Sequence, residues 1–337
     1  MKKFAIAGLF LMTLGLHAQT KPPQAEIHNE QLHVSIYVPG EDQFYKGVRF
    51  EHGGWISDLE YAGHHFYRQW FQGVDPTVRD FVYKGSDIVV GPNTAMVGPA
   101  EEFQQPIGYD TAKPGETFLK IGVGLLRKEK DEKYFFGLHF DVVDGGKWTT
   151  RKTANSITLE QVLGGPDKDY GYVYTKTFRL VGDTNQLVIE HHLKNTGKQP
   201  LATRIYDHNF LTIDGLGVGK AFSVTTPYEI QTKRPADPKF LSVSGKTASY
   251  VADLQGEDRA SLRLEGFGND AKDYDYTITN DAAKVQVRIQ GDHPVINAML
   301  WSIRAVMAVE PFIQVEADPG KDFSWTYTYT YSTTDKK

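Results

Sequence analysis

Two stretches of the chain each contain a side chain that could exchange protons near neutral pH. The first is Tyr206-Asp207-His208-Asn209-Phe210, which follows the turn Asn195-Thr196-Gly197 and a further run of strand-like residues. Histidine titrates near neutral pH, and an adjacent Asp or Asn can fix its tautomer. His208 is therefore a candidate acid or base, and the alternative is a structural histidine at the end of a strand.

The second stretch, Val306 to Phe312, is apolar except for Glu310. A buried carboxylate is costly unless it is paired or used, and burial can raise its pKa into the range that suits base catalysis. Pro311 limits the ladder hydrogen bonds of its strand, which suits a strand edge or a bulge beside a site. Glu310 is therefore a candidate base. The structural alternative is an ion pair with Arg304 or another cation.

Paired acids occur at Glu101 and Glu102, within the segment Gln72 to Lys113, which is rich in Gly, Pro and Asp. We interpret this segment as a long functional loop, because loops of that length in a compact domain are usually functional or disordered. The pair could bind sugar hydroxyls or a cation, or it could form a solvated acidic turn.

Two histidine doublets, at positions 64–65 and 191–192, do not favour a metal site. Adjacent residues of a strand point to opposite faces, so a doublet cannot easily chelate one ion. His191 follows the apolar face of its strand, and we interpret it as a core residue. We expect neither a metal nor a cofactor.

Apolar and polar residues alternate with period 2 along most of the chain, which indicates β-strands. We therefore expect strands to position the candidate residues. The clearest alternating runs are 32–38, 119–125, 187–193, 285–289 and 323–331. Turn residues such as Asp144-Gly145-Gly146 separate them, and no amphipathic helical stretch longer than about two turns is present. The chain is predicted to be all-β. Without a linker or an internal repeat, residues 19–337 are expected to form one large antiparallel sandwich domain.

The first 18 residues are typical of a secretory signal peptide. Lys2 and Lys3 precede an apolar run from Phe4 to Leu16, and small Ala18 offers a cleavage site. We expect an exported mature protein, periplasmic or secreted, beginning at Gln19. The sequence has no cysteine for a disulfide or a lipid anchor, and no second apolar run of membrane-spanning length, so we expect no membrane association after cleavage.

Composition narrows the class of partner. The 337 residues include 37 Lys+Arg and 42 Asp+Glu, for a net charge of -5, with no long basic run. This argues against nucleic acid as the main partner. At 40% hydrophobic residues, the chain can bury a large core and is not a disordered protein.

Taken in order, several motifs resemble the galactose mutarotase (aldose 1-epimerase) superfamily. They are Gly54 to Gly63, Asn195-Thr196-Gly197, His208-Asn209-Phe210, Gly291-Asp292-His293-Pro294, Glu310 and Pro319-Gly320. The resemblance covers most of the chain after residue 18. It implies a large antiparallel super-sandwich with an open carbohydrate cleft on its concave face.

The resemblance also implies roles. In mutarotases a glutamate takes the proton of the anomeric hydroxyl and a histidine protonates the ring oxygen, so that the ring opens and recloses as the other anomer. By position, Glu310 resembles the base and His208 the acid. Typical members carry a sugar-binding arginine and a His-Gly pair, whereas this chain has Glu101-Glu102-Phe103 in the corresponding region. The expected substrate-binding residues are Glu101, Glu102, Tyr206, Asn209, Trp301 and Arg304.

The leading hypothesis is an exported aldose 1-epimerase-like enzyme that acts on a free sugar or on the reducing end of an oligosaccharide. The alternatives are another carbohydrate-active enzyme, such as a polysaccharide lyase or a glycoside hydrolase, and a non-catalytic carbohydrate-binding domain. A glycosidase would need Glu310 to face Glu101 or Glu102 at about 5–10 Å. A binding module would keep its cleft aromatics while His208 and Glu310 lie apart. The epimerase hypothesis requires both residues to line one cleft, within about a sugar ring's width.

Overall fold

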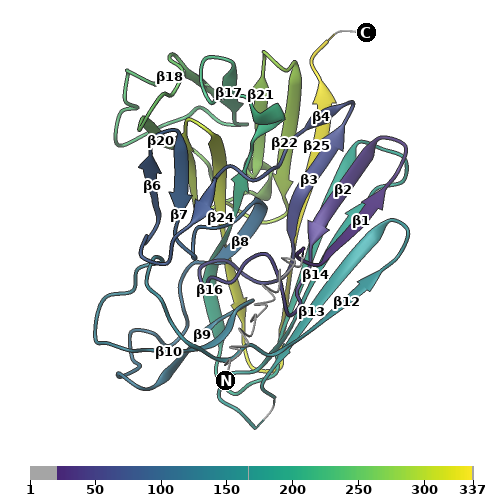
Figure 1. Ribbon diagram of the computed structural model, residues 1–337. Helices are drawn as coiled ribbons and strands as arrows, with labels where there is room; N and C mark the ends of the chain where they lie inside the picture. The colour runs from purple at the N-terminus through teal and green to yellow at the C-terminus, as the bar shows by residue number, and fades with distance from the viewer. Residues whose placement is uncertain (1–20, 166, 336–337) are drawn as a thin grey trace, which may run out of the picture.

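The computed structural model describes residues 21–165 and 167–335, and nearly all of its regular elements are β-strands (Figure 1). Two single-turn 3₁₀ helices, η1 (Ile213–Gly215) and η2 (Ala271–Asp273), are the other elements of this part of the chain. No helix among the described residues is long and apolar enough to cross a membrane. The all-β prediction is confirmed. The predicted signal peptide, residues 1–18, lies outside the described residues and stays a prediction.

The largest layer is a ten-stranded sheet in which every neighbouring pair is antiparallel. Its strands, in spatial order, are β12 (Lys147–Lys152), β13 (Ser156–Leu163), β14 (Tyr172–Leu180), β15 (Gln186–Asn195), β25 (Asp322–Thr333), β22 (Val285–Gly291), β21 (Asp275–Asn280), β17 (Phe222–Thr225), β19 (Thr247–Tyr250) and β18 (Leu241–Ser244). The order brings the C-terminal strand β25 into the middle of the sheet, between β15 and β22.

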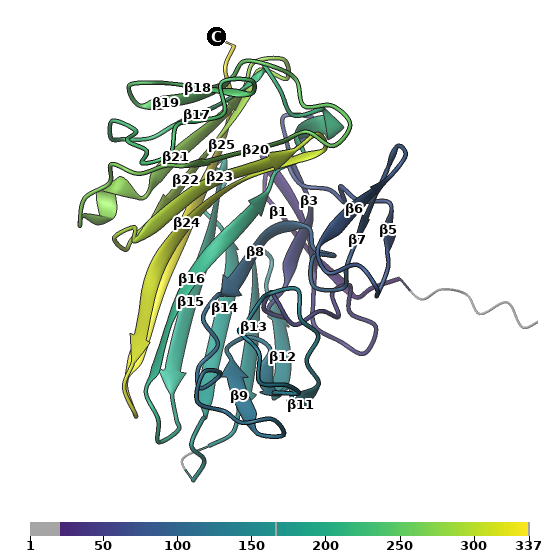
Figure 2. The ribbon, with the colours of Figure 1, turned by 90° about the vertical axis from the view of Figure 1, so that its left-hand side faces the viewer.

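A five-stranded antiparallel sheet lies against the ten-stranded one (Figure 2). Its strands, in spatial order, are β20 (Arg259–Arg263), β23 (Asn297–Ile303), β24 (Val306–Ala317), β16 (Leu201–Phe210) and β8 (Gly98–Phe103). Strand β24 touches β15 and β25 of the larger sheet. The two sheets therefore form a sandwich, as expected for the fold class.

Three smaller sheets complete the described structure. One contains β1 (Gln24–His28), β2 (Leu32–Tyr37), β3 (Trp55–Tyr61) and β4 (His64–His65). The second contains β5 (Gly73–Val74), β7 (Asp87–Val90) and β6 (Phe81–Lys84), and the third β11 (Val142–Asp144), β10 (Gly124–Arg127) and β9 (Thr117–Lys120). The β5–β7 pair is parallel.

The interpretation of Gln72 to Lys113 as one long loop is wrong, because this segment contains β5 to β8. Its strands are short, and Gly and Pro obscure their alternation. Gly98 has φ +62°, a conformation that disfavours a side chain, and Pro99 is tolerated because β8 is an edge strand of the five-stranded sheet.

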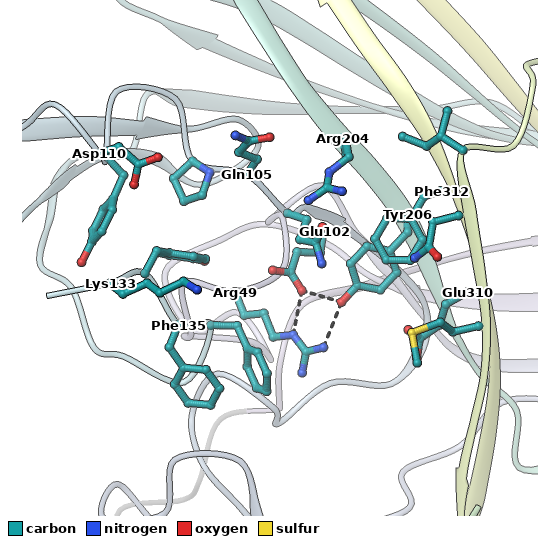
Figure 3. A pocket seen from close by; sticks show the side chains of 18 of the residues that line it. Arg49, Glu102, Gln105, Asp110, Lys133, Phe135, Arg204, Tyr206, Glu310 and Phe312 are labelled. Atoms are coloured by element: carbon teal, nitrogen blue, oxygen red, sulfur yellow. Dashed lines mark hydrogen bonds and ion pairs between the residues drawn. The ribbon is translucent and has the colours of Figure 1, made fainter. Parts of the chain in front are cut away.

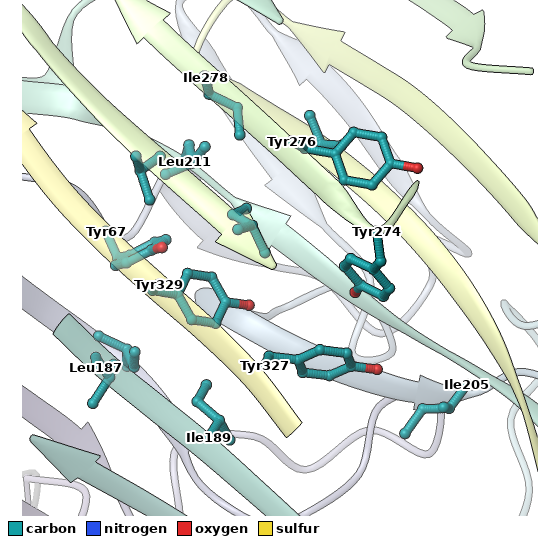
Figure 4. Close-up of a cluster of buried hydrophobic side chains, with 14 of the residues drawn as sticks. Tyr67, Leu187, Ile189, Ile205, Leu211, Tyr274, Tyr276, Ile278, Tyr327 and Tyr329 are labelled. Carbon is teal, nitrogen blue, oxygen red and sulfur yellow. The ribbon is translucent and has the colours of Figure 1, made fainter. Parts of the chain in front are cut away.

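The core between the two large sheets is rich in tyrosine (Figure 4). On β25, Trp325, Tyr327, Tyr329 and Tyr331 are at most 1% exposed, which confirms the alternation expected from the sequence. Ile205 on β16 belongs to the same core. Because side chains alternate along a strand, Tyr206 and His208 must then point to the outer face of the five-stranded sheet.

Candidate active site

The outer face of the five-stranded sheet forms one wall of a cavity of about 760 Å³. Side chains from β8, β16 and β24 line it, among them Glu102, Tyr206 and Glu310. Segments 104–110 and 133–136 form other parts of its wall (Figure 3). We call this cavity the outer compartment.

A smaller cavity of about 260 Å³ adjoins it. The two share the lining residues Arg49, Phe136, Met299 and Glu310, and the smaller one adds His208, Phe210, Trp301, Asp80 and Thr94. We call the smaller cavity the inner compartment. Glu310 therefore borders both compartments, and His208 lines the inner one.

His208 and Glu310 contact each other within this site, with 3.2 Å between His208 Nε2 and Glu310 Oε1. The register of the sheet explains the contact. Strands β16 and β24 are antiparallel with Tyr206 opposite Phe312, so moving two residues along each strand places His208 beside Glu310. Their side chains are only 5% and 11% exposed. The expected proximity is confirmed, while the roles of acid and base stay predictions.

The surroundings of His208 favour a neutral imidazole. Its ring stacks on Phe210, with 3.7 Å between ring centres, and meets Trp301 edge-on. Burial lowers the pKa of His208 well below its usual value, and the positive charge of Arg49 acts in the same direction. Its Nδ1 atom is buried without a hydrogen-bond partner among the described residues.

The surroundings of Glu310 favour a protonated carboxyl group. Burial raises the pKa of Glu310 to about 8; Arg49 opposes this rise and the charge of Glu102 adds to it. Together with a neutral His208, this means that the pair holds one proton near neutral pH. One proton shared between an imidazole and a carboxylate is what paired acid–base catalysis requires.

Arg49 is held in place by Glu102 and Tyr206 (Figure 3). Its Nε donates to Glu102 Oε2 over 2.8 Å and its Nη2 to the Tyr206 hydroxyl over 2.9 Å. The hydroxyl in turn donates to Glu102, and Lys120 Nζ lies 3.3 Å from the other carboxylate oxygen. Burial alone would raise the pKa of Glu102, but Lys120 and Arg49 outweigh it and lower the pKa. Glu102 is thus an ionised anchor for Arg49.

Sequence reasoning missed Arg49, which lies in the segment between β2 and β3. The local signal is weak: a single arginine between Val48 and Phe50, ahead of the Gly54 motif. Its position depends on a long-range contact, because the backbone N–H of Glu51 donates to the carbonyl of Glu101 and so fixes this segment along the edge of β8. No pattern in the sequence reports that contact.

Three of the six predicted substrate-binding residues do line the compartments. Glu102 and Tyr206 line the outer one and Trp301 lines the inner one. The position of Glu102 follows from its face of β8, and those of Tyr206 and Trp301 from the alternation of β16 and β23.

Glu101, Asn209 and Arg304 line neither compartment, so their predicted places in the site are corrected. Glu101 and Asn209 are fully buried on the inner face of the sheet; the Asn209 amide donates to the carbonyls of Asp207 and Val309. Arg304 follows β23, lies over the ring of Tyr83 and donates to two backbone carbonyls. It forms no ion pair with Glu310, whose contact is with His208, so an ion pair between Glu310 and Arg304 is wrong, while one with another cation stays open.

Glu101 belongs to a buried charge cluster between the sheets, with Glu51, Lys176 and His191. Lys176 Nζ contacts both carboxylates, at 2.7 Å from Glu51 Oε1, and His191 Nε2 lies 2.8 Å from Glu101 Oε1. All four side chains are fully buried. The expectation that His191 is a core residue is confirmed. The cluster joins β8 to strands β14 and β15 of the ten-stranded sheet.

Comparison with known proteins adds information on the fold. A scan against protein-family models found no match, and a search of curated proteins found none either. Among solved structures, a protein from Synechocystis sp. PCC 6803 aligns with 96% of this chain and 100% of its own length, at 12% identity and a TM-score of 0.53.

Two further solved structures carry functional descriptions. A galactose mutarotase related enzyme from Lactobacillus acidophilus aligns with 93% of this chain and 99% of its own, at 13% identity and a TM-score of 0.50. An Escherichia coli K12 protein assigned provisionally as an aldose 1-epimerase aligns with 92% of this chain and 99% of its own, at 8% identity and a TM-score of 0.52. The chain therefore has the galactose mutarotase-like fold. At sequence identities this low, the similarity shows a shared fold and nothing about activity.

Proposed function

We propose that this chain, with its galactose mutarotase-like fold, is an aldose 1-epimerase-like enzyme that interconverts the anomers of a free sugar or of an oligosaccharide reducing end. The observation that carries the proposal is the contact between His208 and Glu310 at the junction of the two compartments. An acid and a base within hydrogen-bond distance, with both side chains largely buried, are the groups that ring opening needs.

The reaction needs one proton donor and one proton acceptor. Glu310 as carboxylate takes the proton from the anomeric hydroxyl O1, the C1–O5 bond breaks as the O1–C1 double bond forms, and protonated His208 gives its proton to O5. After rotation about C1–C2, attack of O5 on the other face of C1 reverses both transfers. The two residues hold one proton before and after the cycle, so the atoms balance without a co-reactant.

The pKa shifts make this ionisation state accessible. A protonated Glu310 beside a neutral His208 differs from the reactive carboxylate–imidazolium pair only by transfer of one proton across their 3.2 Å contact. Binding of a polar sugar in place of water supplies hydrogen bonds that favour the charged pair. Arg49 borders both compartments, and its Nη1 forms no hydrogen bond with a described residue, so it can donate to a sugar hydroxyl.

The size of the two compartments agrees with a saccharide ligand. The inner one, at about 260 Å³, is on the scale of a single sugar ring, and its wall includes the rings of Trp301 and Phe210. The outer one, at about 760 Å³, leaves room for further sugar residues or substituents.

The two alternatives receive less support. The glycosidase alternative requires Glu101 or Glu102 to act as the second carboxylate, yet both oxygens of Glu102 are engaged by cations, and Glu101 lies on the inner face of the sheet. A non-catalytic binding module has no need for a His–Glu contact at a place where burial raises the pKa of Glu310 and lowers that of His208.

The test is anomer exchange followed by proton NMR over a panel of free aldoses and uronates. The proposal expects exchange in at least one sugar to accelerate in proportion to protein concentration. His208→Asn should abolish the acceleration, and the control His192→Asn, on the exposed side of β15, should retain it. No acceleration for any sugar of the panel, or full activity in folded His208→Asn, would contradict the proposal.

A further inference from the structure

The outer compartment carries several cationic side chains. Four of its lining residues are basic, and they come from different parts of the fold: Arg49, Lys133, Arg204 and Arg263. Three lining residues are acidic: Glu102, Asp110 and Glu310. If all seven were ionised, the wall would carry one net positive charge. Burial raises the pKa of Glu310 to about 8, so this carboxyl is mostly neutral at pH 7. The net charge of the wall is then two positive charges.

The cations of the wall differ in how well they are paired. Arg49 is engaged with Glu102 through its Nε and with Tyr206 through its Nη2. Arg263 has one polar partner, Asn297 Oδ1 at 3.2 Å. Neither Arg204 nor Lys133 forms a side-chain hydrogen bond or an ion pair with any residue that the structure describes, although Asp110 lines the same compartment.

Arg204 and Lys133 come from different walls of the cavity (Figure 3). Arg204 is on β16, two residues before Tyr206 and four before His208, so it lies on the same outer face as the proposed catalytic residue. Lys133 comes from the segment between β10 and β11, beside Phe135. Both line the compartment into which a ligand bound in the inner compartment would extend.

We propose that the outer compartment binds an anionic group, so that the substrate is an acidic sugar or an acidic oligosaccharide. This inference rests on the proposed function, because the reacting end is assigned to His208 and Glu310. The shared chemistry is a carboxylate, sulfate or phosphate oxygen that accepts hydrogen bonds from Arg204 and Lys133. Both side chains are exposed in the unliganded protein, so little desolvation opposes the contact.

The test compares matched acidic and neutral saccharides by equilibrium binding. The pairs are galacturonate with galactose, glucose 6-phosphate with glucose, glucose 6-sulfate with glucose, and α-1,4-digalacturonate with α-1,4-galactobiose. The monosaccharide pairs show whether the site prefers a carboxylate, a phosphate or a sulfate. The disaccharide pair reaches further into the outer compartment. Titration calorimetry at low salt should give at least one acidic member an affinity about tenfold above that of its neutral partner.

Two variants and one control locate the effect. Arg204→Gln and Lys133→Gln should each reduce the acid preference severalfold and leave binding of the neutral partner unchanged. The matched control Arg151→Gln removes an exposed arginine of β12, outside both compartments, and should keep the preference. Raising the ionic strength from about 0.01 to 0.15 M should lower the affinity for the acidic ligand and leave the affinity for its neutral partner unchanged.

The outcomes separate this inference from the proposed function. Equal affinity within every pair, or a preference that Arg204→Gln and Lys133→Gln leave intact, would overturn the anion site even if neutral sugars undergo catalysed anomer exchange. A preference that the two variants reduce, in a protein that exchanges no anomers, would support the anion site and contradict the epimerase proposal.

Discussion

Glu101 and Glu102 are adjacent on β8, yet their carboxylates bind different cations on opposite faces of the five-stranded sheet. Glu101 contacts Lys176 and His191 in the core between the sheets. Glu102 contacts Arg49 and Lys120 at the outer compartment. One strand therefore links a buried structural charge cluster to the wall of the candidate site. Substitution of Glu101 and substitution of Glu102 should have different effects.

Glu101→Gln should destabilise the protein without changing the site. Removing one carboxylate from a buried pair typically costs about 3–5 kcal/mol, because the partner charge loses compensation; here Lys176 would retain only Glu51. Urea unfolding should report this loss, while anomer exchange per folded molecule should stay at the wild-type value.

Glu102→Gln should instead raise KM. Arg49 and Lys120 lose the anionic partner that fixes them, and charged hydrogen bonds of this kind are worth about 1.5–3 kcal/mol, or about tenfold and more in affinity. The two variants remove the same group one residue apart, so each is the control for the other. Similar kinetic losses in both would contradict the assignment of Glu101 to the core.

Alternation along the strands made the larger part of the fold predictable. The Tyr/Thr pattern of β25 and the apolar runs of β15 and β22 come from strands with one face in the core, so period 2 is visible in the sequence. His208 and Glu310 were recognisable for a related reason. Each is an ionisable group in a stretch of residues that are otherwise buried.

The rest of the site depends on contacts that no local pattern reports. Arg49 reaches Glu102 across 53 positions of sequence, and Lys176 reaches Glu51 across 125. Glu101 was misassigned because β8, with Gly98 and Pro99 at its start, reads as a loop. Once β8 is a strand, alternation alone separates Glu101 from Glu102, by the argument that separates the two members of a histidine doublet.

The rate of anomer exchange should depend on pH in a bell-shaped manner. The pair works with one proton, so activity should fall above about pH 8, where Glu310 and His208 are both deprotonated. It should also fall on the acid side, at a pH below the usual histidine range, where the pair holds two protons. These limits belong to the pair as a unit. A profile with a single inflection near pH 6.5 would indicate an isolated, solvated histidine instead.

Substitutions in the pair should be strongly non-additive. Glu310→Gln removes the proton acceptor and His208→Asn the donor, and each should lower kcat by about 10²–10⁴-fold, the usual contribution of general acid–base catalysis. The double variant should lose far less than the product of the single losses if the residues act as one unit. Sugar affinity should stay within a few-fold throughout. Multiplicative losses in the double variant would mean that the two residues act independently.

The last prediction concerns stability, and it distinguishes a catalytic carboxyl group from a structural ion pair. Near pH 4 Glu310 is largely protonated in both the folded and the unfolded chain. Between its ordinary pKa of 4.5 and its folded value of about 8, the unfolded chain loses the proton while the folded protein keeps it. Stability contributed by this group is therefore full at low pH and declines as the pH rises to about 8.

Glu310→Gln cannot titrate, so it should escape this decline. Its free energy of unfolding should match the wild type near pH 4 and exceed it at pH 8 to 9 by an amount on the order of a few kcal/mol. Urea titrations across that range measure the difference, with Glu316→Gln, an exposed position on β24, as the control that should follow the wild type. A charged His208–Glu310 ion pair kept for stability requires the opposite sign, with Glu310→Gln the less stable protein at neutral pH. A variant that gains stability while losing anomer exchange would identify Glu310 as a group kept at a cost to the fold for its chemistry.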